Sequence, residues 1–510
     1  MAPRSCWTAY AVAQASIALY DSIPRHGKPI VRDNGVPEWT ILSVISLVTS
    51  LDGEKPKIIP LSLGTGVKVL PYAKLPPMGD AIHDCHGEIL ARRGFVRWLI
   101  HQACMLCQKD QGRKVERGAI SEELYLERAL NGEFRLKDGV EVWLYISALP
   151  VRNFSLCTPY TSPTYQRDDC HQLCLQCGDA STMYTAAHQP LNEASEWINI
   201  QTDPSTTTDQ ADVALLQPLR GRRTYTSVAT LRTKPGRSDS IPTTSMSCSD
   251  KISLWVSLGL QGGLLANLFG KIRLKGLVIG GVESPPGWEN EEEWKAKVVA
   301  EVERALVERL SDIAYDLPDE YAVLPPAIFT TSVMFPHSKP QIISLYPGSD
   351  PQPSPLSLSY LPWLSVPAKK GGLKTSEREI ISGGTVLGFL WKPPGMTVIK
   401  PKGRSRICKL EILKAYQRLL EYLDRTAGSH TYFSLKHPPD SAYQLAKALL
   451  RGRPQKIRGV GLWETLGEIW STAQADISNV HVPPFKGWLV SGKDYESFDC
   501  LENYYPTPNS

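Results

Sequence analysis

The sequence predicts an α/β protein in which helices cover both faces of a central sheet. Short apolar runs, such as residues 56–71 and 141–150, alternate along the chain with longer segments that carry apolar residues at helical spacing, such as residues 87–107. The composition of 42% hydrophobic and 21% charged residues is ordinary for a globular protein. A chain of 510 residues is long enough for one enlarged domain or for two.

In chain order, helices and strands can be assigned from the spacing of their apolar residues and from the residues that interrupt them. Helices are expected over residues 8–24, 87–107, 251–269 and 290–313, and a further helix is expected to begin at residue 177. Strands are expected over residues 38–48, 56–71, 141–150 and 274–281. Two polar segments, residues 189–245 and 335–375, are predicted to be loop-rich insertions.

The bulk properties favour a location in the cytoplasm, the nucleus or both. No apolar run approaches the ~20 residues of a membrane span, and the N-terminus lacks the progression of a secretory signal. The formal charge of +4 permits an anionic partner without requiring one. Eleven cysteines in such a chain favour free thiols or metal ligands over a disulfide framework.

The segment HDCHGEILARRGF, residues 83–95, carries the strongest chemical signal. His86 followed two residues later by Glu88 offers one zinc ligand and one carboxylate that can move protons without binding the metal. Cys177 and Cys248 each precede a predicted helix, where a thiolate is favoured. One nitrogen and two sulfur ligands leave the fourth position of a tetrahedral zinc site open for water, as in catalytic sites.

Several segments, in order along the chain, resemble the adenosine deaminase domain of RNA-editing enzymes: EWTILSVI, LGTGVKVL, HDCHGEILARRGFVRWL, CGDAS, SMSCSDKI and SRICKLEIL. That family comprises tRNA-specific adenosine deaminases and adenosine deaminases acting on double-stranded RNA. The resemblance implies a cytidine-deaminase-like central mixed sheet with helices on both faces, enlarged by insertions and by a mostly helical C-terminal extension. It implies a single domain over residues 1–510, with zinc on His86, Cys177 and Cys248 and with Glu88 as the proton shuttle.

The resemblance also implies the substrate and a second cofactor. The chain is most similar to the fungal-type branch that converts adenosine 37 of alanine tRNA to inosine. Family members hold a buried inositol hexakisphosphate, and only such an anion would make many buried cations tolerable. The matching positions are Arg92, Arg93, Lys251, Trp255, Gln261, Lys409, Tyr443, Lys447, Trp488 and Lys493.

Contacts with RNA are expected from two places in the sequence. Lys68 matches a position near the RNA entrance of the family. The basic segment 219–237, which includes Arg220, Arg222 and Arg223, is predicted to contact the RNA backbone. We therefore expect tRNA as the partner, and neither DNA nor a membrane.

Residues 151–176 interrupt the resemblance. In the family the strand proline and the ligand cysteine are adjacent, whereas here this segment separates Pro150 from Cys177. Because it lacks apolar periodicity and begins and ends with residues whose codons suit intron borders, our hypothesis is a retained intron or a gene-model error. A structural zinc knuckle that includes Cys170 and Cys174 is the alternative for this segment.

Two other functions stay open at this point. The chain could edit duplex RNA, although it has no room for accessory double-stranded RNA-binding domains. It could also be a catalytically impaired RNA-binding protein, if the insertion blocks the pocket. Cys104 and Cys107 lie in a helical pattern and are expected to be packed thiols.

Overall fold

The computed structural model describes most of the chain outside the segment from residue 150 to residue 242. The described residues are 4–49, 56–112, 123–149, 219–220, 231–234, 241, 243–284, 288–364, 366–367, 373–374, 377–389, 398–425, 430–439, 441–452 and 483–505. The predictions for residues 151–176, Cys177, Arg222 and Arg223 lie outside these ranges, and so does the side chain of Arg220.

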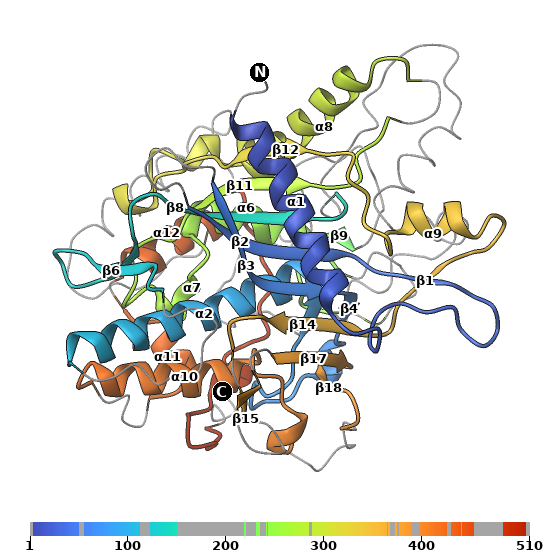
Figure 1. Ribbon diagram of the computed structural model, residues 1–510. Coiled ribbons are helices and arrows are strands. Elements are labelled where there is room, and N and C mark those ends of the chain that lie inside the picture. The colour runs from blue at the N-terminus through green and yellow to red at the C-terminus, as the bar shows by residue number, and fades with distance from the viewer. Residues whose placement is uncertain are drawn as a thin grey trace, which may run out of the picture.

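In the described part of the chain, a mixed sheet of eight strands forms the centre of the molecule, in the order β12-β11-β8-β2-β3-β14-β17-β18 (Figure 1). Strands β8, β11 and β12 run parallel, and the other neighbouring pairs are antiparallel. The strands are β2 (Leu42–Thr49), β3 (Lys57–Thr65), β8 (Val140–Ile146), β11 (Leu274–Ile279), β12 (Ala327–Thr330), β14 (Ser357–Leu361), β17 (Glu377–Ser382) and β18 (Thr385–Val386).

Helices cover both faces of this sheet. Helix α1 (Arg4–Ser22) crosses one face over β3, β8 and β11, and α2 (Gly87–Asp110) packs on the other face against β2, β3 and β14. Helix α10 (Lys409–Tyr422) lies along α2. Helix α6 (Cys248–Leu258) contacts α8 (Glu291–Leu306) and α12 (Ala442–Arg451). The helix pair α7 (Gly262–Leu265) and α11 (Tyr432–Lys436) packs nearby.

Strand β8 shows why a central strand has a nearly continuous apolar sequence. Leu144 and Ile146 belong to the core beneath α2, whereas Tyr145 between them belongs to the core beneath α1. All three side chains are fully buried. Because successive side chains point to opposite faces, a strand covered on both sides needs apolar residues at every position.

Shorter strand pairs and helices surround the sheet. The pairs are β1 (Glu38–Trp39) with β13 (Gln352–Pro353), β4 (Val67–Val69) with β5 (Asp84–His86), β6 (Leu126–Arg128) with β7 (Phe134–Leu136), β9 (Leu219–Arg220) with β10 (Arg232–Thr233), and β15 (Val366–Pro367) with β16 (Leu373–Lys374). Helix α9 (Lys339–Leu345) precedes β13, and 3-10 turns lie at Glu308–Ile313 and Asp494–Glu496.

The predicted α/β class is confirmed, and glycines explain where predicted elements are divided. The segment 56–71 breaks at Gly66, whose φ of 142° and close approach to the carbonyl oxygen of Cys85 leave no room for a side chain. The segment 251–269 breaks at Gly259, which has a φ of 82° and ends α6. Residues 335–375, predicted to be loop-rich, contain α9 and strand β14, which lies inside the sheet between β3 and β17.

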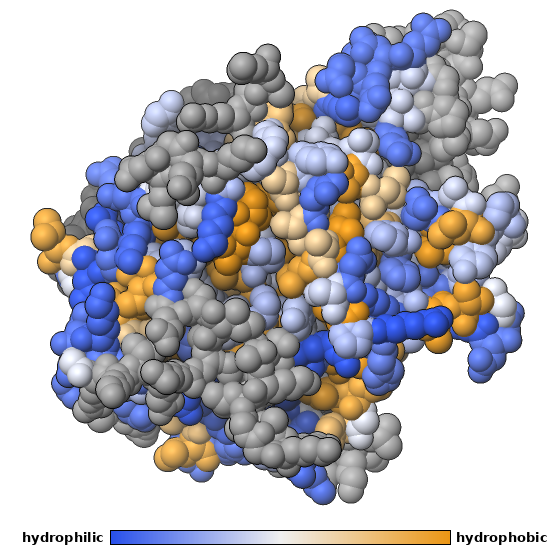
Figure 2. Space-filling view, viewed as in Figure 1, coloured by the Kyte–Doolittle hydropathy of each residue, from blue (hydrophilic) through white to orange (hydrophobic). Residues whose placement is uncertain are grey.

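The amphipathic helix predicted over residues 290–313 is α8 followed by a 3-10 turn. Its acidic first turn lies on the surface, and Figure 2 shows a hydrophilic patch where Figure 1 places α8. Its buried face consists of Trp294, Val298, Val302, Ala305 and Leu306. Among the helices of the described ranges, none is long and apolar enough to cross a membrane.

Candidate active site and basic cavity

His86 is held in a fixed orientation at the junction of β5 and α2. It ends the strand and caps the N-terminus of the helix. Its Nδ1 lies 2.8 Å from Oδ1 of Asp84, which also accepts a hydrogen bond of 3.0 Å from the His86 backbone N–H. An Nδ1–H that donates to a carboxylate leaves Nε2 as the nitrogen able to bind a metal.

Glu88 lies in the first turn of α2 with its side chain almost completely buried. Neither of its carboxylate oxygens has a hydrogen-bond partner among the residues that the structure describes. A buried carboxylate without a partner carries a large desolvation cost. This position therefore points to a ligand, a metal or a substrate that contacts Glu88 when the protein functions.

Cys248 begins α6, directly after Ser247, whose hydroxyl accepts a hydrogen bond from the backbone N–H of Asp250 and caps the helix. The cysteine is fully buried. Burial, and then the neighbouring charge of Glu88, raise the pKa of its thiol. Lys251 of α6 donates to Asp84, which also contacts His86, so the structure brings α6 and the start of α2 together. A bound cation would favour the thiolate of Cys248.

The third predicted zinc ligand, Cys177, lies outside the described residues. Within the described ranges, the structure contains no group of three or more His, Cys, Asp or Glu side chains placed to hold a metal. His86 and Cys248 are therefore the two predicted ligands whose positions the structure gives.

Asp84 connects the candidate active site to a network of buried cations. Its Oδ2 accepts hydrogen bonds from Lys234 at 2.9 Å, Lys251 at 2.5 Å and the hydroxyl of Ser245 at 2.6 Å. Burial alone would raise the pKa of Asp84, but Lys234 and Lys251 hold it well below its usual range. Lys234 also hydrogen-bonds to Cys248, so one lysine contacts both Asp84, the partner of His86, and the second described ligand itself.

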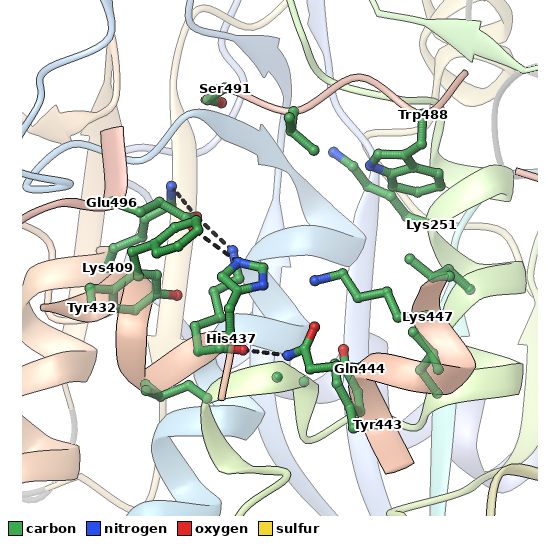
Figure 3. Close-up of a pocket in the computed structure, with 18 of the residues that line it drawn as sticks. Lys251, Lys409, Tyr432, His437, Tyr443, Gln444, Lys447, Trp488, Ser491 and Glu496 are labelled. Atoms are coloured by element: carbon green, nitrogen blue, oxygen red, sulfur yellow. Dashed lines mark hydrogen bonds and ion pairs between the residues drawn. The ribbon is translucent and has the colours of Figure 1, made fainter. Parts of the chain in front are cut away.

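A basic cavity of about 780 Å³ adjoins this network, and all ten residues predicted to bind inositol hexakisphosphate line it. Figure 3 shows Lys447 pointing into the cavity, with Lys409 and Glu496 on one side and Lys251 and Trp488 on another. The elements that supply these residues include α2, α6, α10, α12 and the segment 488–496. Further lining residues that the sequence did not indicate are Lys436, His437, Arg451 and Glu496.

Arg92 and Arg93 lack an acidic partner among the described residues. Nε of Arg92 donates to the carbonyl of Leu260 at 3.0 Å, and its guanidinium lies 5.0 Å from the ring of Trp255. Burial lowers the pKa of Arg92 to about 10. Nε of Arg93 donates to the carbonyl of Ile407. Two neighbouring guanidinium groups that face a cavity and have no carboxylate partner among the described residues favour an anionic ligand.

The described RNA-binding candidate, Lys68, lies beside the candidate active site. It occupies the middle of β4, is exposed, and pairs with Cys85, the residue before His86. The backbone of Arg220 pairs with Thr233 in β10, next to Lys234. Lys68 is thus placed where a substrate that approaches His86 could meet it.

A family model described as "Adenosine-deaminase (editase) domain" matches residues 62–465. The match includes His86, Glu88, Cys248 and most of the residues that line the basic cavity. The chain belongs to this family. Trp488, Lys493 and Glu496 lie after the matched range.

Similar proteins include tRNA-specific adenosine deaminase 1 from three organisms. The Schizosaccharomyces pombe protein is 32% identical over 48% of this chain and 49% of its own length. The Saccharomyces cerevisiae protein is 31% identical over 52% of this chain and 56% of its own length. This chain therefore matches about half the length of these fungal relatives. The human protein is 23% identical over 96% of this chain and 100% of its own length.

The sequence did not indicate the residues that contact and hold the candidate ligands and the cavity lysines. Asp84 could have been found, because it lies two residues before His86 on a strand and such residues share a face. Lys234 and Glu496 carried no local signal. They meet the site only through tertiary contacts with segments far away in the sequence.

Proposed function

We propose that this chain is a zinc-dependent deaminase that converts adenosine to inosine in tRNA, with adenosine 37 of alanine tRNA as its target. Membership of the editase family and similarity to proteins named tRNA-specific adenosine deaminase 1 support this proposal. The observation that carries it is Glu88, a buried carboxylate without a described partner, within electrostatic range of Cys248 and two residues from His86.

The donor set fits zinc. His86 offers Nε2 and Cys248 offers Sγ, and Cys177 is the proposed third ligand. One nitrogen and two sulfurs suit a catalytic zinc site that keeps one position open. When bound, zinc supplies a Lewis acid that lowers the pKa of a water molecule toward about 7.

Other residues of the chain orient His86 and transfer protons. Asp84 fixes the ring of His86 through the 2.8 Å contact. Glu88 accepts a proton from the water that attacks C6 of adenine and delivers a proton to the departing amino group. Water is consumed and ammonia leaves, so adenosine becomes inosine. The base must first be splayed out of the anticodon loop to reach this depth.

Replacement of Glu88 by glutamine tests this mechanism. We expect E88Q to bind zinc as the native chain does but to lose nearly all inosine formation, because the amide cannot accept and return the proton. Inosine is measured by mass spectrometry of nucleosides from alanine tRNA, and zinc by elemental analysis.

Glu303 provides the matched control, since it lies exposed on the surface of α8. E303Q should retain both zinc and activity. Turnover by E88Q at the native rate would show that another group moves the proton. Editing of duplex RNA in preference to tRNA would contradict the proposed substrate.

We further propose that the basic cavity holds inositol hexakisphosphate as a structural cofactor. Support comes from Arg92 and Arg93, which lack a described acidic partner, and from the ten predicted positions that meet at one cavity. Six phosphate groups would supply the charge that these cations require.

A further inference from the structure

The basic cavity contains an acid. Glu496 ends the 3-10 turn Asp494–Glu496, lines the cavity and is 8% exposed. Its Oε1 accepts hydrogen bonds from Lys409 at 2.9 Å and from Lys436 at 2.5 Å, and its Oε2 lies 3.4 Å from Nε2 of His437 (Figure 3). Three of the groups that face the cavity therefore share one carboxylate.

The charge state of Glu496 follows from these contacts. Burial alone would raise the pKa of its carboxyl, but Lys409 and Lys436 hold it well below its usual range. Burial lowers the pKa of His437 to about 4, so the ring is neutral near pH 7. One negative charge thus faces two ammonium groups inside a cavity whose other described charges are positive.

We propose that Glu496 is an internal counter-ion, which holds one wall of the cavity in place before the polyphosphate arrives and then competes with it. This inference rests on the proposed polyanionic cofactor. In the empty chain the carboxylate offsets the repulsion between Lys409 and Lys436. In the loaded chain it lies among phosphate groups of like charge and weakens their binding. The same residue therefore stabilises the empty protein and limits the affinity for the ligand.

Glu502 offers a matched control a few residues away. Its two carboxylate oxygens accept hydrogen bonds from Arg404 at 2.6 and 2.7 Å, and Oε1 also accepts one from Lys414 at 2.6 Å. It too is a partly buried acid that joins two cations to the C-terminal segment, but it does not line the cavity. Its removal should cost stability without changing the affinity for a polyphosphate.

The test compares E496Q and E502Q with the native chain, each stripped of bound ligand and then titrated with inositol hexakisphosphate. We expect E496Q to melt at a lower temperature when empty and to bind the ligand about tenfold more tightly. Its rise in melting temperature on loading should therefore exceed that of the native chain. E502Q should melt lower both empty and loaded, with an unchanged Kd.

The outcomes separate the two proposals. A native chain that inositol hexakisphosphate neither binds nor stabilises would overturn the proposed cofactor. A native chain that binds it, together with an E496Q chain of equal or weaker affinity, would overturn only the role of Glu496.

If E496Q does not fold without ligand, the double variant E496Q/K436Q removes one charge of each sign. It should regain the ligand-free stability that E496Q lost. A double variant as unstable as E496Q would contradict the counter-ion role.

Discussion

At the scale of single residues, Asp84 links the chemistry to the fold. It binds His86 on one oxygen and two lysines, one buried and one partly buried, on the other, so its orientation is fixed from both sides. Carboxylates that orient a ligating histidine are as much part of a metal site as the ligands themselves. The position of His86 therefore depends on Lys234 and Lys251, which lie on segments far from it in the sequence.

Replacement of Asp84 by asparagine should weaken zinc binding by about 10- to 100-fold, because the ring of His86 loses its charged partner. Competition with a chelator of known affinity measures this change. Asp110, which forms an ion pair with Arg128 at the surface, gives the matched control in D110N. Equal zinc affinity in D84N and the native chain would show that Asp84 does not support the metal site.

At the scale of elements, the close contact of α2 with the sheet positions the candidate site. A Cβ at Gly94 would collide with the hydroxyl of Ser62 on β3 and lie 2.5 Å from Cδ2 of Leu361 on β14. Because His86 and Glu88 begin the same helix, a displacement of α2 would move both. The absence of a side chain at Gly94 thus matters for the site as well as for packing.

G94A should lower the free energy of unfolding by roughly 1–3 kcal/mol, since overpacking forces the helix away from the strands. Unfolding in urea measures the change. G270A is the control, because a Cβ there would meet only a glutamate oxygen at 3.5 Å. Equal stability of G94A and G270A would contradict the close approach of α2.

The segment 151–176 also belongs to this scale, although it lies outside the described residues. If it is a retained intron or a gene-model error, a chain that lacks these residues rejoins Pro150 to Cys177 and should form at least as much inosine as the full chain. The activity of both chains on tRNA is compared at equal zinc loading. Loss of activity on deletion would show that the segment is an evolved part of the protein.

At the scale of the whole molecule, the basic cavity joins segments from distant parts of the chain. Helices α2, α6, α10 and α12 and the segment 488–496 all contribute to its wall. Without an anion, their cations repel one another across a buried space. A polyanion at this position would therefore stabilise contacts between the sheet region and the C-terminal helices.

Removal of bound polyphosphate should consequently lower the melting temperature of the native chain, and its return should restore it. A phosphatase that degrades inositol phosphates, followed by thermal unfolding, provides the measurement. The fall in melting temperature should be larger in the native chain than in R92Q/R93Q, where two cavity cations are absent. An unchanged melting temperature would show that the fold does not depend on a bound anion.

Comparison of sequence and structure shows which contacts can be anticipated. Strand β8 and helix α2 were predictable, because burial on both faces leaves a continuous apolar run in a strand, whereas burial along one stripe leaves a helical period. The position of His86 and Glu88 at the start of a helix was predictable from a short motif. Lys234, Lys436 and Glu496 were not, since each is defined by its partner across the fold. Strand β14 was also missed, because its short sequence SLSYL lies within a Pro- and Ser-rich segment.

The most direct test of this account is the zinc environment of the active protein, measured by X-ray absorption and by anomalous diffraction. We predict one zinc ion per chain, bound by one imidazole nitrogen from His86 and two sulfurs, one of them from Cys248. An active preparation without zinc, or a zinc ion with Cys248 outside its coordination sphere, would contradict the account.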